Sequence, residues 1–459
     1  MFLSEKLIDF SDKNMLQHFE FERLLLDRTI PSGRKTLQAA ELPEGATSAT
    51  PAQNDWKDRL SVNSLDAFAN AKLAQLEGAS LRRHFAETRR ELWPDEGPII
   101  FRDGRRLLSF SCNDYLNLSQ HPLVKAAAVA AIEAYGAGSG ASRLVTGNHP
   151  LFAELEQRLA RFKGSEAAAI FGSGYLANLG IIPALVGEGD LILVDALAHA
   201  CILSGSRLAP AECRIFHHND LDDVRRILGA ERARFRHALL VTDGVFSMDG
   251  DLAPVEALAA LCAEYDVWLM TDDAHGLGVL AGGRGSSFID GHKSDVPLQM
   301  GTLSKAVGGY GGYLCASEAV IELLKTRART LLFATGLPPA NVAAAIAALD
   351  IIENDVELTM RPLAKARAFT RHLGLPEAQS PIVPLVLGAA EAALAASKML
   401  EEEGFLVVAI RPPTVPEGTA RLRFAFSAAH RDADVARLAT LVVERIPFRI
   451  EPAPCLPFS

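Results

Sequence analysis

Two kinds of hydrophobic spacing alternate along the middle of the chain, from about residue 120 to 335. Apolar residues recur at helical spacing in segments such as 150–162, where Leu151, Leu155 and Leu159 share one face. Between such segments lie short, continuous apolar runs, which predict strands at 168–171, 191–194, 238–242, 267–270 and 298–301. Continuous apolar strands separated by helices are typical of a mostly parallel sheet buried on both faces. The pattern therefore predicts an α/β fold for this region.

The order of elements changes after residue 340. The spacing there predicts two helices, a strand, a helix, two further strands and a last helix, with strands at 382–387, near 405–410 and at 421–427. This mixed order is typical of a smaller α+β domain. We therefore place a large domain at 116–340 and a C-terminal domain at 341–459.

The N-terminal part has a different character. Apolar residues at helical spacing occupy 1–30, and a segment rich in Pro, Ser, Thr and Gly follows at 42–54. We interpret 1–55 as an extension with a linker. It is either an accessory helix or tail, or a docking segment for a partner.

The segment 56–115 carries the next predicted elements. A helix is expected at about 63–84, and two strands are expected at 99–101 and 107–110. Asp103-Gly104 stands between the strands, and this dipeptide is a strong signal for a tight hairpin turn.

Composition limits the class of protein. The 459 residues are 49% hydrophobic and carry a formal net charge of −10, with basic residues scattered along the chain. Such a charge argues against nucleic acid or an anionic membrane as the main partner. The six cysteines show no metal-ligand spacing, and no apolar run reaches the length needed to cross a membrane. We therefore expect a soluble, cytoplasmic protein with reduced cysteines.

Polar residues follow the five predicted strands of the large domain in turn. In an open parallel sheet, ligands bind beyond the carboxyl ends of the strands. The five groups run from Gly172 to Tyr175, from Asp195 to His199, from Asp243 to Ser247, from Asp272 to His275 and from Thr302 to Lys305. One polar residue after one strand would be uninformative, but five groups in succession predict a functional site at this edge.

Lys305 is the residue on which the chemistry of this edge depends most. It stands among small residues and glycines, in the segment GTLSKA at 301–306, just after an apolar run. A lysine near glycines is usually a solvated loop charge. Here Asp272 and His275 precede it by about thirty residues, at the end of a neighbouring strand. Lys305 is therefore well placed to form a Schiff base with an aldehyde cofactor.

Three further side chains fit a cofactor with a pyridine ring. A buried carboxylate at Asp272 would keep the ring nitrogen protonated, which makes the ring an electron sink. His275 can donate to a ring oxygen, and His199 could stack on the ring face. Each has an ordinary alternative, as a turn-capping aspartate or a loop histidine. In combination with Lys305 they favour a cofactor site.

Gly172-Ser-Gly174 comes directly before a predicted helix. The free amides and the dipole at a helix N-terminus bind phosphate well. The same glycines could belong to a dinucleotide-binding loop, but Leu-Ala-Asn stands in the region of the third glycine, and no acidic residue falls cleanly about 20 positions on at the end of a second strand. The Gly-x-Gly pair alone is compatible with either interpretation.

Three motifs resemble those of the α-oxoamine synthases: DDAHGLG at 272–278, GTLSKA at 301–306 and VTDGVFSMDGD at 241–251. The resemblance covers about residues 63–445. It implies a fold-type-I, aminotransferase-like α/β fold, with a mostly parallel seven-stranded sheet in the large domain and a smaller C-terminal α+β domain. It also implies the cofactor pyridoxal 5′-phosphate and a homodimer with shared active sites.

The reaction implied by this resemblance is an acyl transfer that joins an amino acid to an acyl thioester with loss of CO₂. The segments GSGASRLVTGNH at 138–149 and IRPPTVP at 410–416 most resemble the branch that uses L-alanine and a pimeloyl thioester, on CoA or acyl carrier protein. Another small amino acid or another acyl thioester is the alternative within the family.

The resemblance also assigns cofactor contacts. Lys305 would form the Schiff base and later move the Cα proton, and Asp272 would pair with the pyridine nitrogen. The remaining contacts would come from the amides of Gly174 and Tyr175, from Ser247 and His275 at the ring oxygen, from His199 on the ring face, from Thr302 at the phosphate and from Thr335 at the phosphate of the neighbouring subunit.

Substrate contacts follow from the same resemblance. Arg423 matches the arginine that grips the amino-acid carboxylate, a bidentate task that lysine does poorly. Its neighbour Arg421 would then be structural, and Asn113 is a further pocket candidate. Arg82 and Thr414 match other substrate contacts, although Arg83 could be the true counterpart of Arg82.

Two features depart from the family. Asp243 stands where the family usually has Glu, which is one methylene longer, so we expect a rearranged network near the cofactor. The extension 1–55 has no counterpart in typical members. Neither departure removes a residue that the chemistry requires.

Overall fold

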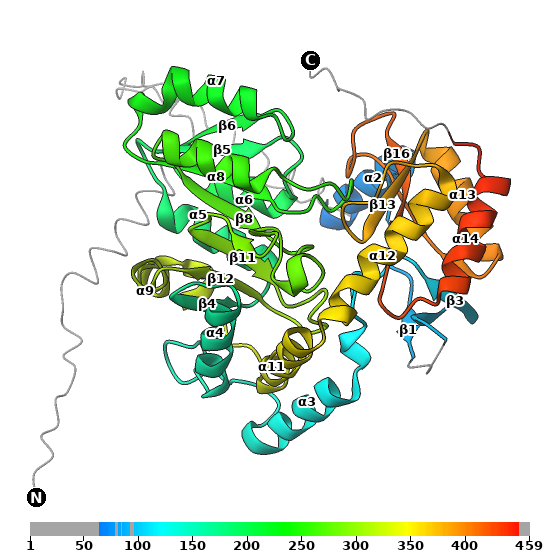
Figure 1. Ribbon diagram of the computed structural model, residues 1–459, viewed down its shortest axis with the longest axis horizontal. Coiled ribbons are helices and arrows are strands. Elements are labelled where there is room, and N and C mark those ends of the chain that lie inside the picture. Colours follow the sequence, from blue (N-terminus) through cyan, green and yellow to red (C-terminus); the bar gives the residue numbers. More distant parts are fainter. Residues whose placement is uncertain (1–63, 79–80, 84, 92–95, 449–459) are drawn as a thin grey trace, which may run out of the picture. The chain divides into compact units, whose positions relative to one another are not determined.

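The computed structural model describes residues 64–78, 81–83, 85–91 and 96–448 (Figure 1). By its internal contacts the chain divides between Arg82 and Arg83 into two units. The first unit contains helix α2 (Ser64–Gly78), on which no residue is buried. The predicted helix is therefore confirmed, but it ends at Gly78 rather than near 84. The predicted extension 1–55 lies outside the described residues.

The second unit contains a seven-stranded sheet with the order β4-β12-β11-β8-β7-β5-β6 (Figure 1). Six of its strands run parallel to one another, and β12 runs antiparallel between β4 and β11. The strands are β4 (Ala167–Phe171), β5 (Leu191–Asp195), β6 (Glu212–Phe216), β7 (Ala238–Asp243), β8 (Trp268–Asp272), β11 (Leu298–Thr302) and β12 (Gly312–Ala316). The five predicted strands and the mostly parallel seven-stranded sheet are confirmed.

Two strands of this sheet, β6 and β12, were not predicted from the hydrophobic pattern. β6 is an edge strand in which Glu212, at its start, and Arg214, in its middle, alternate with apolar residues. β12 begins in a glycine-rich turn and passes against the start of α5 (Gly174–Leu185), the helix that follows β4. A Cβ on Gly312 would lie 2.5 Å from the carbonyl oxygen of Ser173 and 2.7 Å from the nitrogen of Gly174. Glycine is therefore required at this crossing.

Helices cover both faces of the sheet (Figure 1). α4, α7, α8 and α11 pack on one face, and α5, α6, α9 and α10 pack on the other. Because side chains alternate along a strand, Ile192 contacts the second group while Leu193 contacts the first. The helices are α3 (Pro122–Tyr135), α4 (Leu151–Phe162), α5 (Gly174–Leu185), α6 (Ala200–Leu208), α7 (Leu221–Glu231), α8 (Val255–Glu264), α9 (Glu318–Arg327), α10 (Arg329–Leu332) and α11 (Pro339–Asn354). Short elements are η2 (Leu118–Gln120), η3 (Arg232–Arg234), η4 (Ala281–Gly283), β9 (Phe288–Ile289) and β10 (His292–Lys293).

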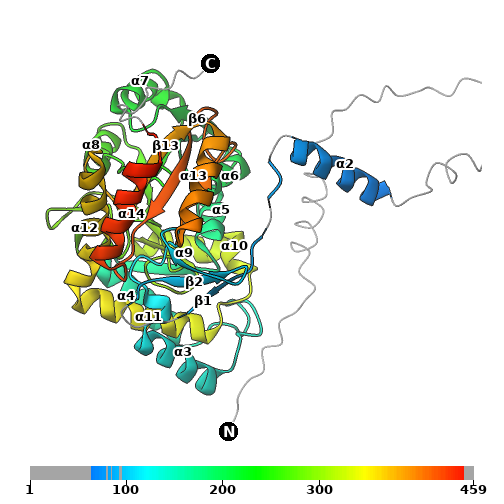
Figure 2. The ribbon, with the colours of Figure 1, turned by 90° about the vertical axis from the view of Figure 1, so that its right-hand side faces the viewer.

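A separate core joins the C-terminal elements to strands from the beginning of the unit. One sheet has the antiparallel order β13-β16-β15, and another has the order β1-β2-β3-β14, in which β14 pairs in parallel with β3. α12 packs beside α14, and α13 lies against β13 and β16 (Figure 2). These elements are β1 (Thr88–Arg90), β2 (Ile99–Arg102), β3 (Arg105–Ser109), α12 (Val356–Leu373), β13 (Ile382–Gly388), α13 (Ala390–Glu402), β14 (Phe405–Leu406), β15 (Val408–Ile410), β16 (Ala420–Ala425) and α14 (Asp432–Arg445).

The hairpin predicted from Asp103-Gly104 is confirmed. β2 and β3 pair in antiparallel register, and the two turn residues have φ of 50° and 73°. This left-handed backbone is what a two-residue hairpin turn requires.

The cores cross the domain boundaries expected from the sequence. Ile99 and Leu108, from the segment 56–115, pack with Phe405 and Phe424 in the C-terminal core. α11, expected in the C-terminal domain, instead packs with α3 and α4 in the core of the large domain. Among the described helices, none has both the length and the apolar character to cross a membrane.

Candidate active site

The carboxyl ends of β7, β8 and β11 lie side by side. The register pairs Asp243 with Asp272 across β7 and β8, and it pairs Asp272 with Met300 across β8 and β11. Thr302 ends β11, and the loop that carries Lys305 follows directly. The topology therefore brings three of the predicted polar groups to one edge of the sheet.

The amine of Lys305 lies inside this edge. Its Nζ is 2.8 Å from Nε2 of His275. Burial lowers the pKa of Lys305 to about 8; the carboxylates of Asp272 and Asp243 oppose this shift, and the charge of Arg423 adds to it. An amine with a pKa near neutrality offers its lone pair readily, as nucleophilic attack and proton transfer both require.

His275 is buried and neutral. Burial lowers its pKa well below the ordinary value, and the positive charges of Lys305 and Arg423 act in the same direction. While Nε2 faces Lys305, Nδ1 lies 2.6 Å from the hydroxyl of Tyr115. The ring can therefore donate one hydrogen bond and accept another, but it carries no charge.

Of the two adjacent aspartates after β8, Asp272 belongs to the site and Asp273 to the scaffold. Asp273 is fully buried in an ion pair with Lys163 at 2.9 Å. Asp272 accepts hydrogen bonds from Nδ2 of Asn178 at 2.8 Å and from the nitrogen of Ala274 at 3.0 Å. The described residues give Asp272 no ion pair, so its carboxylate is free to pair with a cationic group of a ligand.

His199 caps the start of α6 and is held from two sides. Its backbone nitrogen donates to Oδ2 of Asp243 at 2.8 Å, and its Nδ1 lies 2.7 Å from Sγ of Cys201. Burial lowers the pKa of His199, Asp272 opposes this shift and Lys305 adds to it. A neutral, fixed imidazole suits stacking on an aromatic ring.

Asp243, where the resemblance led us to expect Glu, anchors the backbone of His199. Burial and the neighbouring charge of Asp272 raise the pKa of Asp243 well above its ordinary value, although the hydrogen bond from His199 opposes this. Its short side chain thus ties the end of β7 to the start of α6.

The start of α5 forms a cradle with Thr302. Ser173 caps the helix with its side chain, and the first turn of a helix leaves amides without intrahelical partners. A Cβ on Gly174 would lie 3.3 Å from Cβ of Thr302 and 3.4 Å from its Oγ1. Thr302 itself donates to the carbonyl of Gly311 at 2.8 Å. The glycine leaves the space in which a phosphate group could contact both the amides and the hydroxyl.

Tyr175 contributes to this cradle through its backbone. Its side chain is exposed, and the hydroxyl lies 3.4 Å from Oγ of Ser204. The ring therefore points along α6, which leaves the amide in the first turn of α5.

Arg423 is a buried cation with an unused donor. It donates from Nη1 to Oδ1 of Asn113 at 3.1 Å and from Nε to the carbonyl of Ser247, while Nη2 is buried without a partner. Arg421, two residues earlier, forms an ion pair with Asp249. Because the described residues give Arg423 no carboxylate, its charge and its free N–H favour an anionic ligand.

Thr414 is brought together with Arg83. Nη2 of Arg83 donates to Oγ1 of Thr414 at 2.9 Å, within the second unit. Arg82 forms its ion pair with Glu77, at 3.2 Å, within the first unit. Of the two candidate arginines, Arg83 is therefore the one that contacts Thr414.

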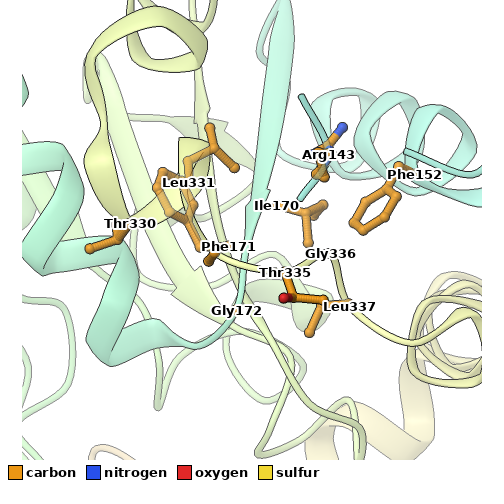
Figure 3. A pocket seen from close by; sticks show the side chains of 11 residues that line it. Arg143, Phe152, Ile170, Phe171, Gly172, Thr330, Leu331, Thr335, Gly336 and Leu337 are labelled. Atoms are coloured by element: carbon orange, nitrogen blue, oxygen red, sulfur yellow. The ribbon is translucent and has the colours of Figure 1, made fainter. Parts of the chain in front are cut away.

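Thr335 lines a small pocket together with Gly172 and Leu337 (Figure 3). It forms a single β-bridge with Ser142. The next residue along, Arg143, forms a bidentate ion pair with Glu156 on α4. Thr335 therefore packs against the segment 138–149. It lines the same pocket as Gly172, which precedes the start of α5.

Three residues that the sequence did not single out hold the site together. Tyr115 contacts His275, and Nδ2 of Asn178 links Sγ of Cys201, at 3.0 Å, to Asp272. The position of Tyr115 two residues after Asn113 is a signal that could have indicated it. Asn178 and Cys201 carry no such signal, because they reach the site through the packing of α5 against α6.

Comparison with known proteins identifies the family. The model of the aminotransferase class I and II family matches residues 105–442. The chain belongs to this family. The 8-amino-7-oxononanoate synthase of Methylocella silvestris is 69% identical over 343 residues, which are 75% of this chain and 98% of the relative. The synthase of the same name from Beijerinckia indica is 63% identical over 386 residues, 84% of this chain and 99% of the relative.

A solved structure agrees with these relatives. Serine palmitoyltransferase from S. paucimobilis, with a bound PLP–myriocin aldimine, has a TM-score of 0.76 and 28% identity, and the match covers 83% of this chain and 98% of that one. The predicted fold-type-I fold and the resemblance to the α-oxoamine synthases are confirmed. The dinucleotide-binding interpretation of Gly172-Ser-Gly174 is not supported.

Proposed function

We propose that this protein is a pyridoxal-phosphate-dependent acyltransferase of biotin biosynthesis. It condenses L-alanine with a pimeloyl thioester, on CoA or acyl carrier protein, to give 8-amino-7-oxononanoate, CO₂ and free thiol. The observation that carries this function is the partly buried amine of Lys305 beside His275, at the sheet edge shared with Asp272. The names of the relatives support the choice of product.

The residues present fit pyridoxal phosphate. The space that a Cβ on Gly174 would fill, next to Thr302, suits the phosphate. The carboxylate of Asp272 has no cationic partner among the described residues and suits the protonated ring nitrogen. Lys305 would hold the aldehyde carbon, and the remaining contacts would come from Tyr175, His199, Ser247 and His275.

Lys305 is the group that moves protons. When bound, the cofactor supplies an electron sink that stabilises negative charge on the Cα atom of the amino acid. Lys305, with its pKa near 8, can remove the Cα proton and return one after CO₂ has left. Proton transfer by a positioned side chain contributes roughly 10²–10⁴-fold to such reactions.

Arg423 and Asn113 would hold the amino-acid carboxylate. The free Nη2 of Arg423 offers the N–H that a bidentate contact needs, and Asn113 keeps the guanidinium in place through its Oδ1. Fixing the carboxylate orients the Cα proton towards Lys305.

The acyl thioester would be bound by residues around Thr414. The contact between Arg83 and Thr414 supports this proposal, because the guanidinium beside Thr414 could bind an anionic group of this substrate. We further propose a homodimer in which Thr335 contacts the cofactor phosphate of the neighbouring subunit. With a net charge of −10, nucleic acid and anionic membranes are poor partners.

A substrate screen on the purified enzyme tests this function. Alanine, glycine and serine are combined with acyl thioesters of several lengths, and thiol and CO₂ release are measured. Alanine with a pimeloyl thioester should give the largest kcat/KM. Preference for serine with a long acyl chain, or for glycine with acetyl-CoA, would assign the chain to another member of the α-oxoamine synthases.

A further inference from the structure

A chain of hydrogen bonds leads from Lys305 to Arg423 through a tyrosine. Nζ of Lys305 lies 2.8 Å from Nε2 of His275, whose Nδ1 lies 2.6 Å from the hydroxyl of Tyr115. That hydroxyl lies 3.4 Å from Oδ1 of Asn113, which also accepts from Nη1 of Arg423 at 3.1 Å. The amine that moves the proton and the guanidinium that holds the carboxylate are therefore connected through Tyr115.

Tyr115 is closed off from solvent. It is 0% exposed, and burial raises its pKa to about 12 although the charge of Arg423 and a hydrogen bond from it oppose this shift, so Tyr115 remains a neutral hydroxyl. A neutral hydroxyl has one proton to donate and lone pairs that accept. Two acceptors lie within its reach, Nδ1 of His275 and Oδ1 of Asn113.

His275 needs a partner that can both donate and accept a hydrogen bond, because its own proton can be on either ring nitrogen. Without the cofactor, a protonated Lys305 donates to Nε2, so the neutral ring carries its proton on Nδ1 and donates to Tyr115. Tyr115 then donates to Asn113. With the cofactor, the role proposed for His275 is to donate from Nε2 to the ring oxygen. Nδ1 then has no proton and needs a donor, because an unpaired buried nitrogen is costly.

Resting on the proposed function, we propose that Tyr115 is the positioning residue that donates to Nδ1 of His275 and so keeps Nε2 of His275 protonated towards the cofactor ring oxygen. Tyr115 acts through the histidine and does not itself touch the reacting atoms. The same hydroxyl accepts from Nδ1 when the cofactor is absent, and a rotation about its C–O bond separates the two arrangements.

Tyr115→Phe tests this role because it removes the hydroxyl and keeps the buried ring. The measurements are the affinity of the apoenzyme for pyridoxal phosphate and the pH midpoint of the absorbance of the bound cofactor. Without a firm N–H donor, the ring oxygen holds its proton more tightly, so the midpoint should rise by about one unit. Affinity for pyridoxal phosphate should fall about tenfold. The charged and titratable groups that face His275, namely Lys305, Arg423 and His199, are unchanged in this variant.

Tyr313→Phe is the matched control. Tyr313 is also 0% exposed, and its hydroxyl is buried without a partner. This variant should keep the wild-type midpoint and affinity. Site-specific replacement of Tyr115 by 3-fluorotyrosine keeps the hydroxyl and makes it a stronger donor, so it should shift the midpoint in the opposite direction even if the phenylalanine variant folds poorly.

A double-mutant cycle separates positioning from packing. In a His275→Asn background, Tyr115→Phe should have no further effect on the midpoint or on the affinity. Equal effects in both backgrounds, or a wild-type midpoint in Tyr115→Phe together with no shift in the fluorotyrosine protein, would overturn the role of Tyr115. A wild-type protein that binds no pyridoxal phosphate would instead overturn the proposed function.

Discussion

Arg421 and Arg423 lie two residues apart on β16, on the same face of the strand, yet they have different electrostatic partners. Arg421 is paired with Asp249, whereas the guanidinium of Arg423 contacts Asn113 and the carbonyl of Ser247 and keeps Nη2 unused. The resemblance assigned Arg423 to the carboxylate of the substrate and left Arg421 as a structural residue. The ion pair assigns Arg421 to the scaffold, which leaves Arg423 for the ligand.

Removing Arg423 should therefore weaken amino-acid binding. For Arg423→Ala we expect the KM for alanine to rise on the order of 10- to 100-fold, because a charge-assisted, bidentate contact is lost. Arg423→Lys should recover only part of this loss, since an ammonium group cannot form the two parallel hydrogen bonds. Steady-state kinetics with alanine as the varied substrate provides the measurement.

Arg421→Ala serves as the comparison. It leaves Asp249 without its partner, so its main effect should be a lower melting temperature, with the KM for alanine near the wild-type value. A larger rise of KM in Arg421→Ala than in Arg423→Ala would reverse the assignment of the two residues.

Replacing Lys305 should remove the chemistry and leave the fold intact. We expect Lys305→Ala to lack the near-visible absorbance of the lysine-bound cofactor and to lose at least about 10³-fold in kcat, since the proton-transfer group is missing. Absorbance spectra and single-turnover kinetics measure the two effects. Full turnover with the band retained would contradict the role of Lys305.

The stability of the cofactor-free protein should depend on pH through Lys305. Burial lowers its folded-state pKa to about 8, below the unfolded value of about 10.4. Below pH 8 both states are protonated and the full cost of burying the charge is present. Between pH 8 and 10.4 the unfolded state binds more protons, so stability rises with pH. Relative to Lys305→Met, which does not titrate, the wild type should gain up to about 3 kcal/mol between pH 7 and 10.5.

Urea unfolding of both proteins across this pH range measures the difference. The comparison cancels other titrating groups, including His218, whose pKa is raised to about 10 by Asp195 and Asp251 against the effect of burial. A difference that does not change with pH would show that Lys305 is not buried as a charged group.

Adding one methyl group at Gly174 should strongly weaken the binding of pyridoxal phosphate. Gly174→Ala would place a Cβ 3.3–3.4 Å from Thr302, in the space proposed for the phosphate, so affinity for pyridoxal phosphate should fall by about tenfold or more. Gly229→Ala, in α7, is the control, because its nearest neighbour is the Tyr265 hydroxyl at 3.8 Å. That variant should keep full affinity and gain up to about 1 kcal/mol in helix stability. Equilibrium titration of both apoenzymes measures the affinities.

The sequence predicts those parts of the structure that follow from local patterns. The apolar runs locate β8 and β11, and the polar residues after them locate Asp272 and Lys305. β12 was not predicted, because its position depends on the backbone crossing at Gly312 rather than on a hydrophobic run. Tyr115 was not singled out either, because its contact with His275 joins residues 160 positions apart.

Which of two adjacent, chemically identical side chains belongs to the site is decided by packing and cannot be predicted from the sequence. Asp272 and Asp273 have the same residue type and adjacent positions, and only the buried Lys163 shows which of them is neutralised. The choice of Arg83 over Arg82 depends in the same way on a contact with Thr414, far along the chain.

The pairing of β3 with β14 has a consequence for the synthesis of the protein. Leu108 lies opposite Phe405, so the two strands leave the ribosome roughly 300 residues apart. At a synthesis rate of about 5–20 residues per second, the strand and helices that cover β2 and β3 are made about 15–60 s after these two strands. During that interval the core that buries Ile99, Leu108 and Phe110 has not been synthesised, so we expect chaperones to bind these exposed apolar side chains of the nascent chain.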